Sequence, residues 1–157
     1  MAFDPNEQRR IMGHFATGVT VVTTRLGQIL HGMTANAVTS LSLDPPLVLV
    51  AIGRDNQMYE LLPQSRIFAL NILRRDQEDL SNRFAVPGPK DFSDLSLTTA
   101  ATGAPLLQDT LGWVDCNLTE VLPGGDHDIF IGEIAAGDAH SGSPLLYYGG
   151  QYTQLSE

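Results

Sequence analysis

Cysteine, whose disulfides stabilise many secreted domains, occurs once in this 157-residue chain, at Cys116. No disulfide can form within one chain, which fits a reducing compartment. The first residues are polar and acidic, whereas a signal peptide is basic and then apolar. No apolar run approaches the length of a membrane span. We therefore expect a cytoplasmic protein that makes no membrane contact.

Positive charge is scarce as well. Lysine occurs once, and the chain has 9 basic against 18 acidic residues, for a formal net charge of −9. The basic residues form no run longer than two, so nucleic-acid binding is not expected. The four histidines lack metal-ligand spacing, and no metal site is expected. Glycine-rich phosphate loops and the Gly-x-Ser-x-Gly motif are also missing, which argues against those nucleotide-binding and hydrolase classes.

What the chain does contain is a series of strand patterns. Its length fits one domain spanning residues 1–157, and 43% hydrophobic residues supply a core. β-Branched and apolar runs predict strands at 19–24, 29–41, 47–52, 66–73, 111–122, 129–136, 145–148 and 152–155. Residues 90–105 are expected to form a loop. The class predicted is mainly β: an antiparallel barrel with peripheral helices.

Three helices are expected around these strands. The first is capped by Asp4, has Pro5 in its first turn and stops near Gly18. The second starts near Asn56 and ends at Pro63. Asp76 is expected to cap the third.

Small polar residues precede two prolines in the most informative segment, residues 32–47. Thr34, Ala35 and Asn36 carry little bulk, and their side chains offer both hydrogen-bond donors and acceptors. A flat ring with polar edge atoms, such as a flavin, could lie against this backbone. An ordinary half-polar strand explains the same residues equally well.

Two arginines are candidate anion ligands. Arg54 follows an apolar strand and precedes a predicted helix start, where free N–H groups favour a phosphate. Asn56 or Asp55 as a simple helix cap is the alternative. Arg83 near the end of the third helix is a second candidate, or it only complements the helix dipole.

His127 has the most suggestive setting among the histidines. It follows Gly124, Gly125 and Asp126 in a predicted hairpin turn, where Asp126 or Asp128 could orient the imidazole. A surface turn histidine is the alternative. Cys116 lies within a strand, where packing is a better explanation than nucleophilic chemistry.

An ordered set of short motifs resembles the flavin reductase family, small NAD(P)H:flavin oxidoreductases that serve two-component monooxygenases. The resemblance runs nearly end to end. It rests on Phe15-Ala16-Thr17-Gly18-Val19-Thr20, Gly32-Met33-Thr34-Ala35-Asn36, Ser40-Leu41-Ser42-Leu43-Asp44-Pro45-Pro46-Leu47, Phe68-Ala69-Leu70-Asn71, Arg83-Phe84-Ala85, Gly125-Asp126-His127, and Pro144-Leu145-Leu146-Tyr147-Tyr148 with Tyr152.

The resemblance implies a split β-barrel of the FMN-binding type that works as a homodimer. It implies hydride transfer from the C4 of NADH or NADPH to the N5 of FMN or FAD, with reduced flavin passing to a separate monooxygenase. The implied cofactor contacts are Thr34, Ala35, Asn36, Ala37, Ser40, Leu41, Ala51, Ile52, Gly53 and Arg83. His127, Tyr147 and Tyr148 would face the nicotinamide nucleotide, with His127 as the catalytic candidate.

The sequence departs from the family pattern after Gly53. The family often has a Ser/Thr-rich segment there, but this chain has Asn56-Gln57-Met58. Arg54, Asn56 and free helix N–H groups could hold the phosphate instead. The choice between FMN and FAD stays open.

Two other functions fit the same residues. A tightly bound FMN could pass electrons to ferric iron or a quinone. Alternatively, a split barrel could carry a flavin or a haem without catalysis, and such a carrier would have no use for a nicotinamide contact at His127.

Overall fold

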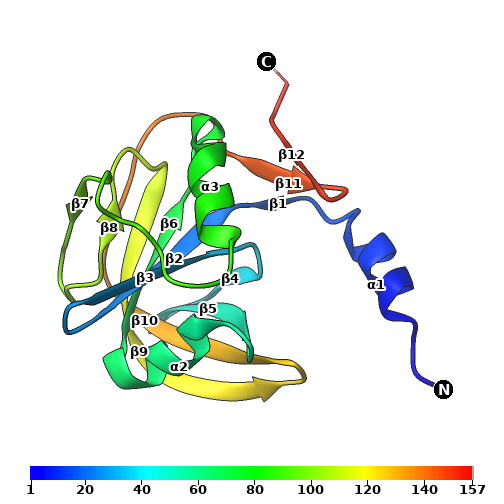
Figure 1. Ribbon diagram of the computed structural model, residues 1–157, viewed down its shortest axis with the longest axis horizontal. Coiled ribbons are helices and arrows are strands. Elements are labelled where there is room, and N and C mark those ends of the chain that lie inside the picture. Colours follow the sequence, from blue (N-terminus) through cyan, green and yellow to red (C-terminus); the bar gives the residue numbers. More distant parts are fainter. Residues whose placement is uncertain (157) are drawn as a thin grey trace.

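A curled antiparallel sheet dominates the computed structural model, which describes residues 1–156 (Figure 1). Its strand order is β3-β2-β6-β9-β10-β5-β4, and every neighbouring pair is antiparallel. The strands are β2 (Thr20–Leu26), β3 (Ile29–Ala35), β4 (Val38–Leu43), β5 (Pro46–Gly53), β6 (Ile67–Ile72), β9 (Gly112–Gly124) and β10 (His127–Ala139). The predicted mainly β, antiparallel class is confirmed.

The two edge strands of this sheet, β3 and β4, are joined by only Asn36 and Ala37. The sheet must therefore curl until its edges meet at this corner. The Ala51 amide donates to the Ala37 carbonyl at 3.0 Å, which ties the corner to β5. The prediction of one strand over 29–41 was wrong because the chain turns at Asn36 and Ala37 and passes from one edge strand of the sheet to the other.

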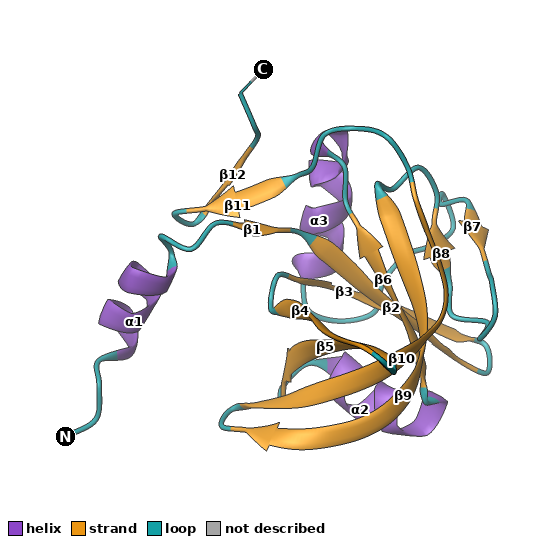
Figure 2. Cartoon of the chain, turned by 180° about the vertical axis from the view of Figure 1, so that it is seen from behind, coloured by secondary structure: helices purple, strands orange, loops and turns teal. Residues whose placement is uncertain are grey.

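Two smaller sheets and the helices surround the main sheet (Figures 1 and 2). β1 pairs with β11 and β11 with β12, while β7 pairs with β8 within the predicted 90–105 loop and just beyond it. The remaining elements are α1 (Pro5–Met12), α2 (Gln57–Ser65), the 3-10 turn η1 (Arg75–Gln77), α3 (Glu78–Ala85), β1 (Thr17–Gly18), β7 (Leu97–Thr98), β8 (Leu106–Leu107), β11 (Leu146–Tyr148) and β12 (Gln151–Thr153).

Helix boundaries differ from the predicted ones at three places. Helix α1 begins as expected, with the Asp4 carboxylate accepting from the Asn6 amide, but it ends at Met12 with Gly13 as its cap. The Gly149 amide donates to the Gly13 carbonyl, so the chain leaves the helix to approach β11. The stop predicted near Gly18 was wrong because Gly18 already lies in β1.

Pro63 does not end α2. The helix runs on to Ser65, and Arg66 closes it in the left-handed region at φ 61°. Pro63 has no N–H and so removes one helical hydrogen bond, which α2 tolerates two residues before its end. Asp76 does not cap α3 either: it lies 3.3 Å from Arg74, and Gln77 takes the cap position.

Two apolar clusters position the elements. Val22, Phe68 and Phe130 belong to the cluster inside the curled sheet, where α2 contributes Met58 and Leu62. The second cluster lies under α3 and includes Phe84. Gly32 of β3 passes so close to the Phe84 ring that an added Cβ would lie 2.8 Å from it. Within residues 1–156, no helix combines the length and apolar character required to cross a membrane.

Candidate functional site

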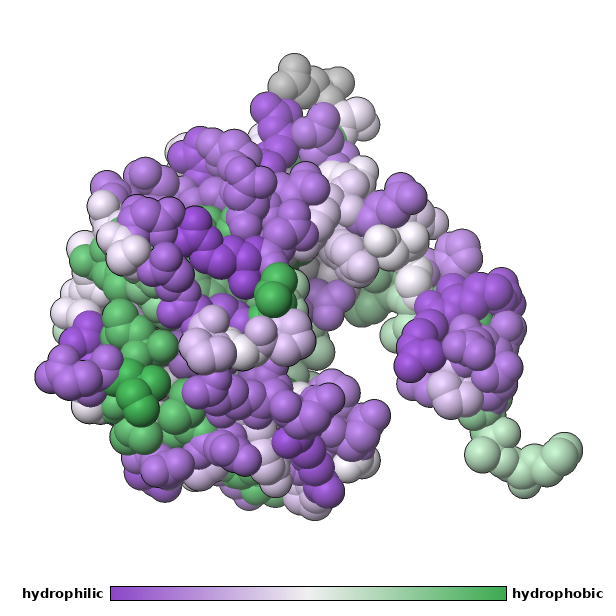
Figure 3. Space-filling model, in the orientation of Figure 1, coloured by the Kyte–Doolittle hydropathy of each residue, from purple (hydrophilic) through white to green (hydrophobic). Residues whose placement is uncertain are grey.

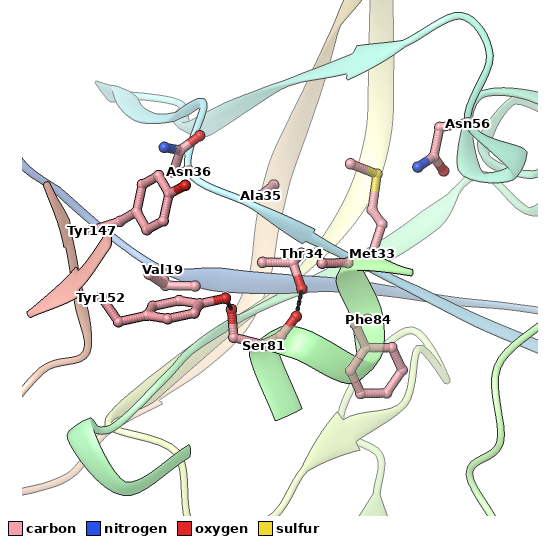
Figure 4. A pocket seen from close by; sticks show the side chains of 11 residues that line it. Val19, Met33, Thr34, Ala35, Asn36, Asn56, Ser81, Phe84, Tyr147 and Tyr152 are labelled. Atoms are coloured by element: carbon pink, nitrogen blue, oxygen red, sulfur yellow. Dashed lines mark hydrogen bonds between the residues drawn. The ribbon is translucent and has the colours of Figure 1, made fainter. Parts of the chain in front are cut away.

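A cavity of about 250 Å³ lies where the free edge of β3 meets α3 and the β11–β12 hairpin (Figure 4). We call it the β3 cavity. Segments far apart in the sequence meet in it because the C-terminal hairpin packs beside the helix. Its lining consists of Val19, Met33, Thr34, Ala35, Asn36, Asn56, Ser81, Phe84, Ala85, Tyr147 and Tyr152.

The β3 side of the cavity is polar and made largely of backbone. β3 is an edge strand, so part of its N–H and C=O groups lack a strand partner. The Thr34 hydroxyl donates to the Ser81 carbonyl at 2.5 Å, which fixes β3 to α3. Asn36 is exposed at the cavity, and no hydrogen bond engages its amide among the described residues. This edge can therefore bond a ligand with alternating donors and acceptors.

Two tyrosines form the opposite wall. The rings of Tyr147 and Tyr152 meet edge to face, with centroids 5.5 Å apart and an interplanar angle of 67°. The hydroxyls of Tyr152 and Ser81 lie 2.6 Å apart, and Tyr152 also donates to the Asn82 carboxamide oxygen at 3.1 Å. These bonds hold the C-terminal hairpin against α3. The wall offers aromatic surface to a flat ring.

A second hollow of about 600 Å³ adjoins the β3 cavity and shares Asn56 and Ala85 with it. We call it the α2 hollow. Arg54 lines it and donates to Asp128 from Nε at 3.1 Å and from Nη2 at 2.9 Å. The hydrogen bond with Asp128 raises the pKa of Arg54. Asn56 accepts from the Met58 amide at 2.8 Å, so it does cap α2 while lining both spaces.

Several predicted contacts lie outside both spaces. Ser40 and Leu41 are exposed on β4, and Ala37 is at the corner between the edge strands. Ala51, Ile52 and Gly53 end β5, and Ile52 is fully buried in the core. Of the predicted set, the β3 cavity collects Thr34, Ala35, Asn36, Asn56 and Tyr147.

Arg83 points to an acidic loop instead. Its two terminal nitrogens donate to the Asp94 carboxylate at 2.6 and 2.9 Å, and Nη1 also donates to the Asp91 carbonyl. These hydrogen bonds lower the pKa of Asp94 and raise that of Arg83. Arg83 lines neither the β3 cavity nor the α2 hollow.

His127 and Tyr148 are separated from the cavity lining. His127 stands at the tip of the β9–β10 hairpin, opposite Gly53 in β5, and its Nδ1 lies 2.7 Å from the Asp126 carboxylate. This bond lowers the pKa of Asp126. Tyr148 follows Tyr147 on β11, and its hydroxyl is hydrogen-bonded to Nδ1 of His14 at 3.3 Å.

Local sequence chemistry did not single out Val19, Met33, Ser81, Phe84, Ala85 and Tyr152 as site residues. The one available signal was Ser81, a small polar residue on the same helix as the apolar Phe84. Cys116 is buried, and burial raises the pKa of its thiol to about 12. It is a thiol at neutral pH, consistent with the predicted packing role.

The chemistry of the β3 cavity suits an isoalloxazine ring. A free strand edge and the Asn36 amide can bond its polar rim, and the tyrosines can cover its plane. The α2 hollow lies near Asn56, and Arg54, which is paired with Asp128, lines it.

Comparison with known proteins assigns the class. The family described as "Flavin reductase like domain" matches residues 12–156. The chain belongs to the flavin reductase family.

Relatives and solved structures of this family cover nearly the whole chain. The reductase component of a Rhodococcus opacus 4-nitrophenol 4-monooxygenase/4-nitrocatechol 2-monooxygenase is 38% identical, over 95% of this chain and 80% of that protein. A Streptomyces globisporus NADH-dependent FAD reductase is 37% identical, over 98% of this chain and 88% of that protein. The structure of flavin reductase PheA2 has a TM-score of 0.91 and 41% identity, covering 99% and 100% of the two chains.

Proposed function

We propose that this protein is an NAD(P)H-dependent flavin reductase that supplies reduced flavin to a separate monooxygenase in the cytoplasm. When both are bound, the nicotinamide supplies the hydride from C4 and the flavin accepts it at N5. The observation that carries the proposal is the β3 cavity: a free polar strand edge facing two tyrosines, in a fold shared with flavin reductases.

The residues of this chain would bind and orient the two reactants. The edge of β3 and Asn36 would hold the rim of the flavin ring, and Tyr147 with Tyr152 would limit its tilt. The Thr34–Ser81 bond keeps this strand edge at a fixed distance from α3. Such fixed placement of two rings in contact supplies much of the rate advantage in reactions of this kind.

Steady-state oxidation of NADH and of NADPH, with riboflavin, FMN or FAD as acceptor, tests the function directly. We expect turnover that depends on added flavin and continues after the purified protein has been dialysed. If the protein stays yellow through dialysis and reduces ferric iron, the alternative function is favoured, in which a tightly bound FMN passes electrons to iron or a quinone. Absence of turnover with all three flavins would reject the reductase function.

Filling the mouth of the β3 cavity should block flavin binding. Asn36→Trp places a large side chain at an exposed position, so folding should be preserved. We expect the flavin Kd to rise about tenfold or more, a loss of at least roughly 1.4 kcal/mol. Flavin fluorescence quenching measures this, with Gln64→Trp on the exposed face of α2 as the control. Equal affinities of the two variants would contradict this placement of the flavin.

His127→Ala should raise the KM for NADH about tenfold and change the flavin Kd less than twofold. The resemblance assigns His127 to the nicotinamide nucleotide, and its place at the hairpin tip lies outside the lining of the β3 cavity, so flavin binding should be spared. Asp126→Asn should raise the KM for NADH by a smaller factor, because it removes only the carboxylate that orients the imidazole ring. If His127→Ala weakens flavin binding as strongly as NADH use, the role in nicotinamide binding is wrong.

We also propose that the protein is a homodimer in which the N-terminal arm, residues 1–15, packs on a second copy. Helix α1 stands away from the body and buries no residue (Figures 1, 2 and 3). Exposed apolar side chains line the arm: Phe3, Ile11, Met12 and Phe15, with exposures of 64%, 46%, 55% and 70%. An isolated eight-residue helix is marginal in water, so a covering partner explains its order.

Sedimentation measurements over a concentration series test the dimer. The double variant Ile11→Asp with Phe15→Asp should raise the dimer dissociation constant about 100-fold or more, since each buried apolar side chain contributes roughly 1.5–3 kcal/mol. Ile29→Asp, at an apolar position half exposed beside the β2–β3 turn, is the matched control. A dimer unaffected by the double variant would place the interface elsewhere.

A further inference from the structure

Ser81 of α3 is hydrogen-bonded to both walls of the β3 cavity (Figure 4). It is fully buried, its carbonyl accepts from the Thr34 hydroxyl at 2.5 Å, and its own hydroxyl lies 2.6 Å from that of Tyr152. Thr34 belongs to the strand edge of the cavity, and Tyr152 belongs to the tyrosine wall that faces it. A single helical residue therefore determines how far apart the two walls stand.

The donor and the acceptor can be assigned in the hydrogen bonds around the Tyr152 hydroxyl. Tyr152 has one hydroxyl proton, and it donates this proton to the Asn82 carboxamide oxygen at 3.1 Å. The Ser81 hydroxyl is then the donor in its contact with Tyr152. Because its proton is engaged by Asn82, the Tyr152 hydroxyl suits a group that orients the wall rather than one that transfers protons.

The tyrosine wall has little backbone support of its own. β11 and β12, which carry the two rings, contain only three residues each, and β1 beside them contains two. Packing against the second apolar cluster keeps both rings in the wall, but such packing is non-directional. The Tyr147 ring meets Tyr152 edge to face, so the bonds that fix the Tyr152 hydroxyl on α3 also orient Tyr147.

We infer that Ser81 and Tyr152 are positioning residues for hydride transfer, because the bond between their hydroxyls fixes the gap in which the flavin and nicotinamide rings meet. This inference rests on the proposed flavin reductase function. The step breaks the C4–H bond of the dihydronicotinamide and forms an N5–H bond on the flavin, so that two electrons pass from the first to the second.

The loss of this bond should slow the reaction without releasing the flavin. The aromatic surface of the wall remains when only a hydroxyl is removed, so the flavin still binds. A smaller share of the bound rings then has the reactive spacing, and the rate of such a step depends steeply on that spacing. An interaction of this kind lowers kcat and kcat/KM together.

Single-turnover reduction of bound FMN by NADH, followed without oxygen by the loss of flavin absorbance, tests the inference. Tyr152→Phe keeps the ring, and we expect hydride transfer about fivefold to tenfold slower, with the FMN Kd changed by less than about twofold. Ser81→Ala removes the same bond from the helix side, keeps the carbonyl that Thr34 uses and should act similarly. The double variant should be no slower than Tyr152→Phe, because the bond is already lost.

Ser65→Ala is the matched control. The Ser65 hydroxyl lies 2.8 Å from the Thr24 hydroxyl, which is the same kind of bond, but Ser65 lines neither the β3 cavity nor the α2 hollow. Its removal should cost stability in denaturant unfolding and leave the rate of hydride transfer unchanged.

Wild-type rates in both single variants would overturn the inference. A slower hydride step in Ser65→Ala would also overturn it, since the effect would then be a general loss of stability. Losses that multiply in the double variant would show that the two hydroxyls act separately, and a weaker FMN affinity with an unchanged rate would make the wall a binding surface only. In all these cases turnover by the wild-type protein would still support the reductase function, which fails only if no flavin is reduced.

Discussion

Asp115→Ala is expected to lower the free energy of unfolding by about 2–4 kcal/mol. Asp115 is fully buried on β9 and accepts hydrogen bonds from the amides of Ala101 and Thr102, both at 2.8 Å, and from the Thr102 hydroxyl. Removing the carboxylate deletes all three hydrogen bonds, each worth about 1.5–3 kcal/mol because the acceptor is charged. Water at the exposed Ala101 and the half-buried Thr102 recovers part of that loss. The 101–104 loop would lose its anchor, and this loop carries the fully buried Ala104, which packs with Ala69 and Leu106.

Denaturant unfolding at one fixed protein concentration measures this change. Glu120→Ala is the matched control, because Glu120 is an exposed carboxylate on the same strand. It should change stability by no more than about 0.5 kcal/mol. Asp115→Asn keeps one acceptor oxygen and should fall between the two. If Asp115→Ala were as stable as the Glu120 variant, the anchoring role of this carboxylate would be refuted.

Gly132→Ala should destabilise the protein by about 1–3 kcal/mol, because it inserts a methyl group into a filled core. The new Cβ would lie 2.5 Å from Cζ of Phe68 and 2.9 Å from Cβ of Cys116. Both neighbours are fully buried, so neither can move aside freely. Gly18→Ala, with no atom within 4 Å of its Cβ position, is the control.

Replacing the opposing aromatic ring with a smaller side chain should restore part of the stability that Gly132→Ala loses. In the double variant Gly132→Ala with Phe68→Leu, the methyl group gains room that the aromatic ring had occupied. The two changes should therefore cost less together than the sum of the single variants, which a double-mutant cycle measures in the same unfolding experiment. Strictly additive losses would show that the clash is not with Phe68.

Local patterns predicted the strands well because their signal is short-range. Alternation and β-branched residues marked β2, β5, β6, β9 and β10, and the prolines after Asp44 fall at the β4–β5 turn as expected. The errors came where a distant contact overrode the local preference. The 29–41 segment splits at Asn36 because two sheet edges meet there, and α1 ends early because Gly13 bonds Gly149.

The candidate site was only partly predictable for the same reason. Thr34, Ala35 and Asn36 could be nominated because their small polar side chains form one continuous stretch. The contact between Tyr152 and Ser81 could not be predicted, since no local pattern indicates that their hydroxyls lie 2.6 Å apart. Arg83 looked like an anion ligand in the sequence, but Asp94 holds it outside the cavity.

The order of residues along the chain by itself determined most of the strands, the mainly β class and, through its motifs, the resemblance to flavin reductases. These depend on neighbours within a few positions, where sterics and hydrogen bonding act directly. Only the tertiary structure decided which side chains share the β3 cavity, and that His31 lies buried beside it in the α2 hollow. The curl of the sheet sets those neighbours, and that curl arises from packing between strands far apart in the chain.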